Sequence, residues 1–134
     1  MHSDQPLLVE LDNSILAAAT KVLATLKPGL SENGYEKALV LELRKWGFRV
    51  EHQKLFEVHY EKILVDLLVV NLVVDGQTIV YCRVVEDFSP TLVAQVCGAL
   101  AISGLSEGLL LNFRKKELAW KHIDRETVPV AVCP

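Results

Sequence analysis

Cysteine is scarce in this sequence. The chain has three cysteines, Cys82, Cys97 and Cys133, and no two of them form a CxxC pair. An odd, widely spaced set is poorly suited to a disulfide framework or to a cysteine-rich zinc site. We therefore expect reduced thiols, with Cys82 and Cys97 acting as small hydrophobic residues inside apolar runs.

An excess of basic residues is also missing. Fourteen lysines and arginines stand against 17 aspartates and glutamates, so the formal net charge is −3 and the sequence pI is near 5.8. Strong nucleic-acid binders usually carry a basic excess, because much of their affinity comes from phosphate contacts. The charge balance argues against a nucleic-acid partner but leaves room for a local basic patch.

No segment predicts a membrane span or a secretory leader. The residues from Met1 to Pro6 lack a basic region that leads into an apolar core. The longest apolar run, from Ile63 to Val74, is interrupted by Asp66 and Asn71 and is too short and β-branched for a membrane helix. We expect a soluble cytoplasmic protein with no membrane partner.

The length of 134 residues fits one domain, over residues 1–134, that buries about two-thirds of its unfolded surface. The hydrophobic share of 51% indicates either a sheet buried on both faces or an association surface.

Hydrophobic periodicity predicts an α/β fold with a central mixed sheet and the order α-α-β-β-β-α-β. Helices are expected over residues 12–26, 31–46 and 90–103. Asp12, Asn13 or Ser14 is the expected cap of the first helix, and Ser89-Pro90 begins the third. Period-two patterns predict strands over residues 48–60, 63–74, 78–85 and 108–113, with a last edge strand or short extension over 118–123. The strands over 63–74 and 78–85 are apolar on both faces, which is typical of a sheet covered on two sides.

Asp75-Gly76 predicts a hairpin but leaves its register open. A two-residue turn puts Asp66 on the face of Tyr81 and Arg83, where Asp66 and Arg83 are neighbours able to form an ion pair. A three-residue turn pairs Asn71 with Tyr81 and points Asp66 to the other face.

A motif of the form G-x-x-E-x-x-Y spans residues 29–35, and Glu36, Ala38-Leu39, Glu42-Leu43-Arg44 and Gly47 follow it. Together with Gln95 and the segment from Gly108 to Phe113, these residues resemble the GxxExxY protein family, a branch of the PD-(D/E)XK nuclease-like superfamily. The resemblance covers about residues 12–123. It implies a restriction-endonuclease-like core in which a glutamate, an aspartate, a second carboxylate and a lysine serve Mg²⁺-dependent hydrolysis.

The resemblance carries the glutamate onto Glu32, the aspartate onto Asn71, the second carboxylate onto Tyr81 and the lysine onto Arg83. Three of these four positions are altered. Tyrosine is a poor Mg²⁺ ligand at neutral pH because its phenol stays protonated, and arginine does not readily shuttle a proton. The sequence therefore predicts a dismantled metal site with no cofactor.

Other residues offer weaker signals. Gln95 matches a family position near the cleft, and Tyr35 is expected to pack rather than to catalyse. His52, His59 and His122 share no metal-ligand spacing with one another or with the cysteines, and we expect them on the surface.

Three functions follow. The leading hypothesis is a catalytically degenerate nuclease-like domain, a pseudoenzyme, that acts as a binding or assembly module. The second is a residual nuclease that uses Mg²⁺ with Glu32, Asp66 and Arg83. The third is a structural homodimer, which the apolar excess favours.

Overall fold

The computed structural model describes residues 10–124, which form three helices and one five-stranded mixed sheet. The α/β class and the predicted order of the first seven elements are confirmed, and the segment left open as a short extension is a full strand. The elements are α1 (Glu10–Leu26), α2 (Glu32–Lys45), β1 (Val50–Tyr60), β2 (Ile63–Val74), β3 (Thr78–Arg83), α3 (Pro90–Ser103), β4 (Glu107–Asn112) and β5 (Ala119–Asp124).

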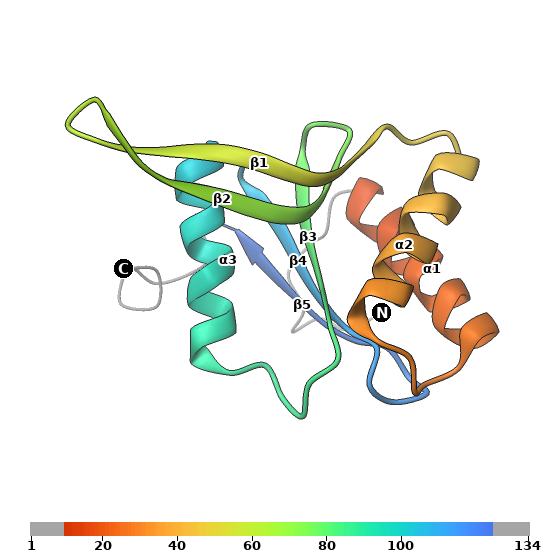
Figure 1. Cartoon of the computed structure of the whole chain (residues 1–134). Helices are drawn as coiled ribbons and strands as arrows, with labels where there is room; N and C mark the ends of the chain where they lie inside the picture. The colour runs from red at the N-terminus through yellow and green to blue at the C-terminus, as the bar shows by residue number, and fades with distance from the viewer. Residues whose placement is uncertain (1–9, 125–134) are drawn as a thin grey trace.

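The strands lie in their chain order, β1-β2-β3-β4-β5, and only the β3–β4 pair is parallel. Helices α1 and α2 cover one face of the sheet and α3 covers the other (Figure 1). This arrangement is consistent with a restriction-endonuclease-like fold. It makes β3 the central strand, and all of its residues except Arg83 are buried.

Local chemistry sets the helix ends. The Ser31 side chain accepts a hydrogen bond from the backbone N–H of Gly34 at the start of α2, and Ser89 does the same for Leu92 at the start of α3. The expected cap of α1 is wrong, because Asp12, Asn13 and Ser14 all lie inside the helix. Asp12 is fully buried and accepts a hydrogen bond from Thr78 of the sheet.

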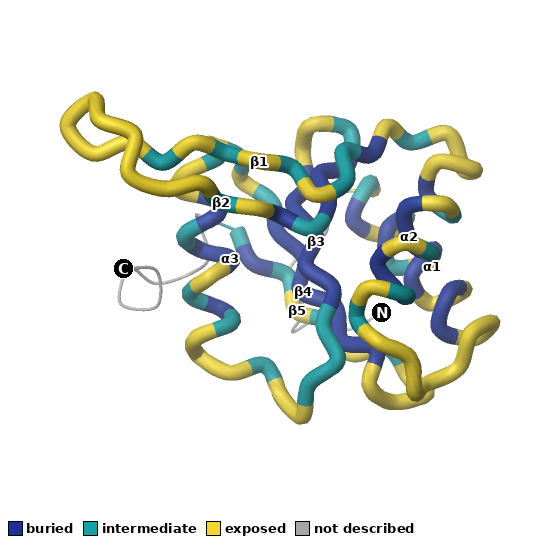
Figure 2. The backbone as a smooth tube through the Cα atoms, viewed as in Figure 1, coloured by how far each residue is buried: buried dark blue, intermediate teal, exposed yellow. Residues whose placement is uncertain are grey.

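The expectation that β2 is covered on both faces is correct only for its C-terminal part, residues 70–74. Residues from Ile63 to Leu67 are exposed, and the outer part of the β1–β2 hairpin extends past the body of the molecule (Figure 2). We call residues 55–69 the hairpin arm. Its exposed large hydrophobic side chains are Leu55, Tyr60, Ile63, Leu64, Val65, Leu67 and Val69.

The β2–β3 hairpin has the three-residue register, since Val74 pairs with Thr78. The side chains nevertheless exchange faces farther along β2: Leu72 packs with α1 and α2, whereas Val70 packs with α3. The exchange falls between the pairs His52–Leu72 and Lys54–Val70, at Asn71 on β2 and at Gln53 on β1, which has a positive φ of 56°. Asp66 therefore lies on the face of Tyr81 despite the three-residue turn.

Cys97 is disulfide-bonded, so the expectation of reduced thiols is wrong for this residue, while Cys82 is a free buried thiol. Among the described residues, no helix is long and apolar enough to cross a membrane.

Candidate functional site

The positions singled out by the family resemblance gather where β3 ends. A cleft of about 400 Å³ lies between this end of β3, the hairpin arm and α3. Its lining brings together four of the expected residues, which are Asp66, Tyr81, Arg83 and Gln95. From α3, Gly98, Ala99 and Ile102 complete this side of the cleft. Glu32, Asn71 and Tyr35 are outside this lining.

Arg83 is fixed by its neighbours. One guanidinium nitrogen donates to the Asn71 side-chain oxygen at 3.0 Å and to the Cys82 carbonyl at 2.9 Å. The same Asn71 oxygen accepts the backbone N–H of Cys82 at 2.9 Å. The guanidinium also lies 5.0 Å from the centre of the Tyr81 ring, within the range of a cation–π contact. A positive charge is thus held beside Asn71 and Tyr81, the two positions where the resemblance implies carboxylates.

Tyr81 is buried, with 4% of its surface exposed. Burial raises the pKa of its phenol, and the positive charge of Arg83 only partly opposes this effect. The phenol is therefore protonated at neutral pH and is not an anionic ligand. Burial likewise raises the pKa of the Cys82 thiol well above its usual range, so Cys82 is neutral too.

Asp66 is exposed at the cleft, and its carboxylate accepts a hydrogen bond from the backbone N–H of Leu67 at 2.8 Å. Within residues 10–124, no ion pair joins Asp66 to Arg83, whose described partners are Asn71, Cys82 and Tyr81. Asp66 needs no such partner because it is solvated rather than buried.

Glu32 faces a different part of the sheet. Its carboxylate accepts the backbone N–H of Val84 at 2.9 Å, just after β3 ends. One turn later on α2, the buried carboxylate of Glu36 lies 2.7 Å from His52 Nε2 and also accepts from the Gln53 side chain. These contacts give both glutamates a role in joining α2 to the sheet.

Tyr35 is fully buried and makes contacts that fix the loop before α2. Its hydroxyl donates to the Lys27 carbonyl at 2.6 Å and accepts the backbone N–H of Leu30 at 3.1 Å. Its ring stacks on Phe113, with centroids 4.8 Å apart. Gln95, by contrast, is exposed on α3 at the cleft.

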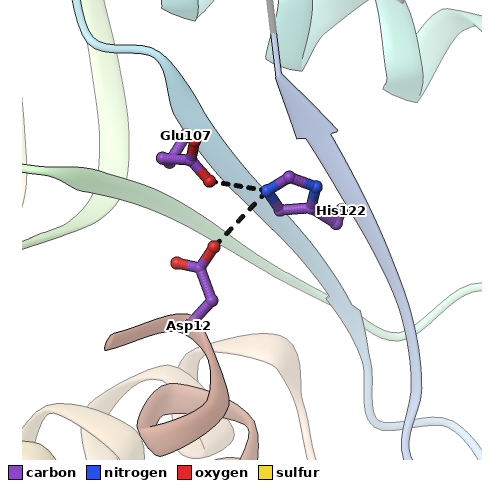
Figure 3. Close-up of side chains that lie close together, drawn as sticks. All are labelled: Asp12, Glu107 and His122. Carbon is purple, nitrogen blue, oxygen red and sulfur yellow. Dashed lines mark hydrogen bonds and ion pairs between the residues drawn. The ribbon is translucent and has the colours of Figure 1, made fainter. Parts of the chain in front are cut away.

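A second polar cluster lies at the opposite end of β3, and no sequence motif predicts it. Figure 3 shows Asp12 from α1, Glu107 from β4 and His122 from β5 pointing toward one another. His122 Nε2 is 2.6 Å from Glu107 Oε1 and 3.4 Å from Asp12 Oδ2. The expectation of a surface histidine is wrong for His122, whose side chain is 3% exposed, but holds for His59 at 46%.

The electrostatics of this second cluster follow from its two carboxylates. The nearby Asp12 carboxylate is the main cause that raises the pKa of His122 to about 9; burial opposes this effect, and Glu107 adds to it. Burial raises the pKa of Glu107, with Asp12 adding to this and His122 opposing it. In the absence of another cation, His122 is therefore the positive charge between the two acids.

Comparisons with known proteins agree with the fold. Residues 9–125 match the family model of the PD-(D/E)XK nuclease superfamily. Searches of curated proteins and of solved structures gave no match. Since the matched segment covers most of the chain, this protein belongs to the PD-(D/E)XK nuclease superfamily.

Proposed function

We propose that this protein is a catalytically degenerate PD-(D/E)XK domain of the GxxExxY type that acts as a binding or assembly module. The observation that carries the proposal is the contact between Arg83 and Asn71. Catalysis in this superfamily needs carboxylates around Mg²⁺, whereas here an amide and a guanidinium are bonded to each other at two of the inferred positions.

Charge supports the same proposal. A guanidinium stays protonated at every physiological pH, so Arg83 repels a divalent cation in its neighbourhood. Tyr81 contributes no negative charge, and Asp66 is the one carboxylate among the residues that line the cleft. A single exposed carboxylate holds Mg²⁺ weakly, because protein sites for this ion usually combine carboxylates with substrate phosphates.

Titration calorimetry with MgCl₂ on the full chain tests this proposal. We expect no saturable binding, because three of the four inferred positions, Asn71, Tyr81 and Arg83, carry neutral or positive side chains and only Glu32 keeps a carboxylate. A micromolar Mg²⁺ site would contradict the proposal. If Mg²⁺ binding disappeared in Asp66→Asn or Glu32→Gln, the Mg²⁺ site would be located near these carboxylates.

A residual nuclease is the second candidate, and the shared cleft of Asp66, Arg83 and Gln95 favours it. In this function Glu32 and Asp66 hold Mg²⁺, and Arg83 binds the phosphate. It requires Mg²⁺-dependent cleavage of DNA or RNA that is lost in both Glu32→Ala and Asp66→Ala. Cleavage that persists in both variants points to a contaminating nuclease.

The hairpin arm favours assembly as a homodimer. Leu55, Leu67 and Val69 are 46–55% exposed, and cross-strand pairing puts Leu55 opposite Val69. They alternate with Phe56 and Leu68, which pack toward α3. In addition, β1 is an edge strand of the described sheet, with backbone groups available for another strand. Antiparallel pairing of two β1 edges would join two apolar arms around a two-fold axis.

Sedimentation velocity tests the homodimer. We expect a dimer for the unchanged chain and a monomer for Leu67→Glu, because the substitution puts a charge into an apolar contact. Leu41→Glu is the matched control, since Leu41 is 69% exposed on α2, away from the arm. A monomer at high concentration for the unchanged chain would contradict this assembly.

A further inference from the structure

The cluster of Asp12, Glu107 and His122 lies at the end of β3 opposite the cleft, and among residues 10–124 it is a group of side chains placed closely enough to hold a metal ion. One ligand atom from each residue lies within 4.8 Å of the others. We propose that these three side chains form a binding site for a divalent transition metal, with Zn²⁺ as the ion that fits best.

An unpaired atom is the first reason. Asp12 is fully buried, and its Oδ2 atom has no hydrogen-bond partner within the described part of the chain. This oxygen is directed into the cluster, 3.4 Å from His122 Nε2 (Figure 3). A buried carboxylate oxygen without a hydrogen bond is costly, and a bound metal ion would give it a direct ligand contact in place of the longer contact with His122.

The groups behind the ligands are the second reason. Thr78 donates its hydroxyl to Asp12 Oδ1 at 2.9 Å, which leaves Oδ2 facing the centre of the cluster. His122 has Nε2 near the carboxylates and Nδ1 toward Asp124, whose Oδ2 is 3.8 Å away, beyond hydrogen-bond distance. Metal-binding histidines typically have a carboxylate or carbonyl near the second ring nitrogen, and ligating carboxylates are themselves hydrogen-bonded.

The spacing also suits a metal. Two ligand atoms at about 2.1 Å from a tetrahedral ion are about 3.4 Å apart. The Asp12–His122 separation already has this value, and the 2.6 Å contact between His122 and Glu107 must widen by less than about 1 Å. Glu107 is 23% exposed, so its side chain has room to adjust and provides the route of entry.

The donor set selects the ion. One imidazole nitrogen with two carboxylate oxygens suits Zn²⁺, whereas Mg²⁺ prefers oxygen ligands and retains its waters. Three protein ligands leave the fourth position for water. A metal here would join the start of α1 to β4 and β5 and would thereby add to the stability of the fold.

Titration calorimetry with ZnCl₂ on the full chain, freed of metal by a chelator, tests the site at neutral pH. We expect one ion per chain with at least micromolar affinity and a rise in melting temperature. His122→Gln and Glu107→Gln should each weaken binding at least about 10-fold, and Thr78→Val should weaken it through Asp12. The matched control, His59→Gln, removes an exposed histidine and should leave binding unchanged.

If His122→Gln does not fold, because His122 is buried, Glu107→Gln still tests the site, because Glu107 is partly exposed. Absence of saturable Zn²⁺ binding to the folded, unchanged chain would overturn the proposal. Binding that is equal in the unchanged chain and in Glu107→Gln would also overturn it, because the ion would then be held elsewhere. Neither result bears on the MgCl₂ titration, which concerns the other end of β3.

Discussion

Substitution of Tyr35 by alanine is expected to lower the free energy of unfolding by about 3–5 kcal/mol. The side chain is fully buried and stacks on Phe113, so its removal leaves a cavity between α2 and the sheet. The Lys27 carbonyl and the Leu30 N–H also lose their partner. Thermal unfolding should show a fall of at least about 10 °C in melting temperature for a chain of this length.

Two variants separate the contributions within this prediction. Tyr35→Phe keeps the stacked ring but removes the hydroxyl, so it should cost about 1–3 kcal/mol. Leu41→Ala is the control, because Leu41 is 69% exposed on α2, away from the hairpin arm, and its loss should change stability by less than about 0.5 kcal/mol. If Tyr35→Ala unfolded at the temperature of the unchanged chain, the structural role assigned to Tyr35 would be wrong.

Substitution of Gly108 by alanine is the second large effect that we expect. Gly108 is buried on β4, and a methyl group on its Cα would lie 2.8 Å from Val96 Cγ1 and 3.4 Å from the Ile123 carbonyl. Valine is branched at Cβ and has little rotamer freedom in a helix, so α3 must move away from the sheet. Overpacking of this kind costs about 1–3 kcal/mol, which denaturant unfolding will measure.

Gly98→Ala provides the matched control for Gly108. Gly98 lies in α3, the helix that Gly108 of β4 packs against, but a methyl group on Gly98 meets no atom within 4 Å. Alanine favours a helix over glycine, so this variant should be as stable as the unchanged chain or up to about 1 kcal/mol more stable. Equal stabilities of Gly98→Ala and Gly108→Ala would contradict the close contact between β4 and α3.

The sequence predicted the parts of the fold that depend on local chemistry. The serine caps at Ser31 and Ser89 specify helix starts through their own side chains. The segment from Thr78 to Arg83 predicted a buried central strand, because apolar side chains point to both faces of the sheet there. The family motif likewise placed Glu32 and Tyr35 on one helix.

Features that depend on distant segments were outside the reach of local patterns. The backbone N–H of Asp75 donates to the Arg49 carbonyl, and the Asp75 carboxylate accepts the backbone N–H of Arg49. These two hydrogen bonds to the residue before β1 accompany the three-residue turn between β2 and β3. The apolar run of β2 looks the same in sequence whether or not a helix covers it, so the exposure of the hairpin arm was missed. Asp12 and His122 meet only because α1 packs beside β5, and no spacing rule joins residues so far apart.

The position of β3 has a consequence for the energetics of the whole molecule. Thr78 and Arg83 begin and end this strand, so about 16 Å of extended chain lies between them. Energetic coupling between substitutions usually fades beyond about 7–10 Å when the sites share no partner. Changes at the Asp12 end and at the Asn71 end should therefore add independently, which would let natural variation alter one end while the other is preserved.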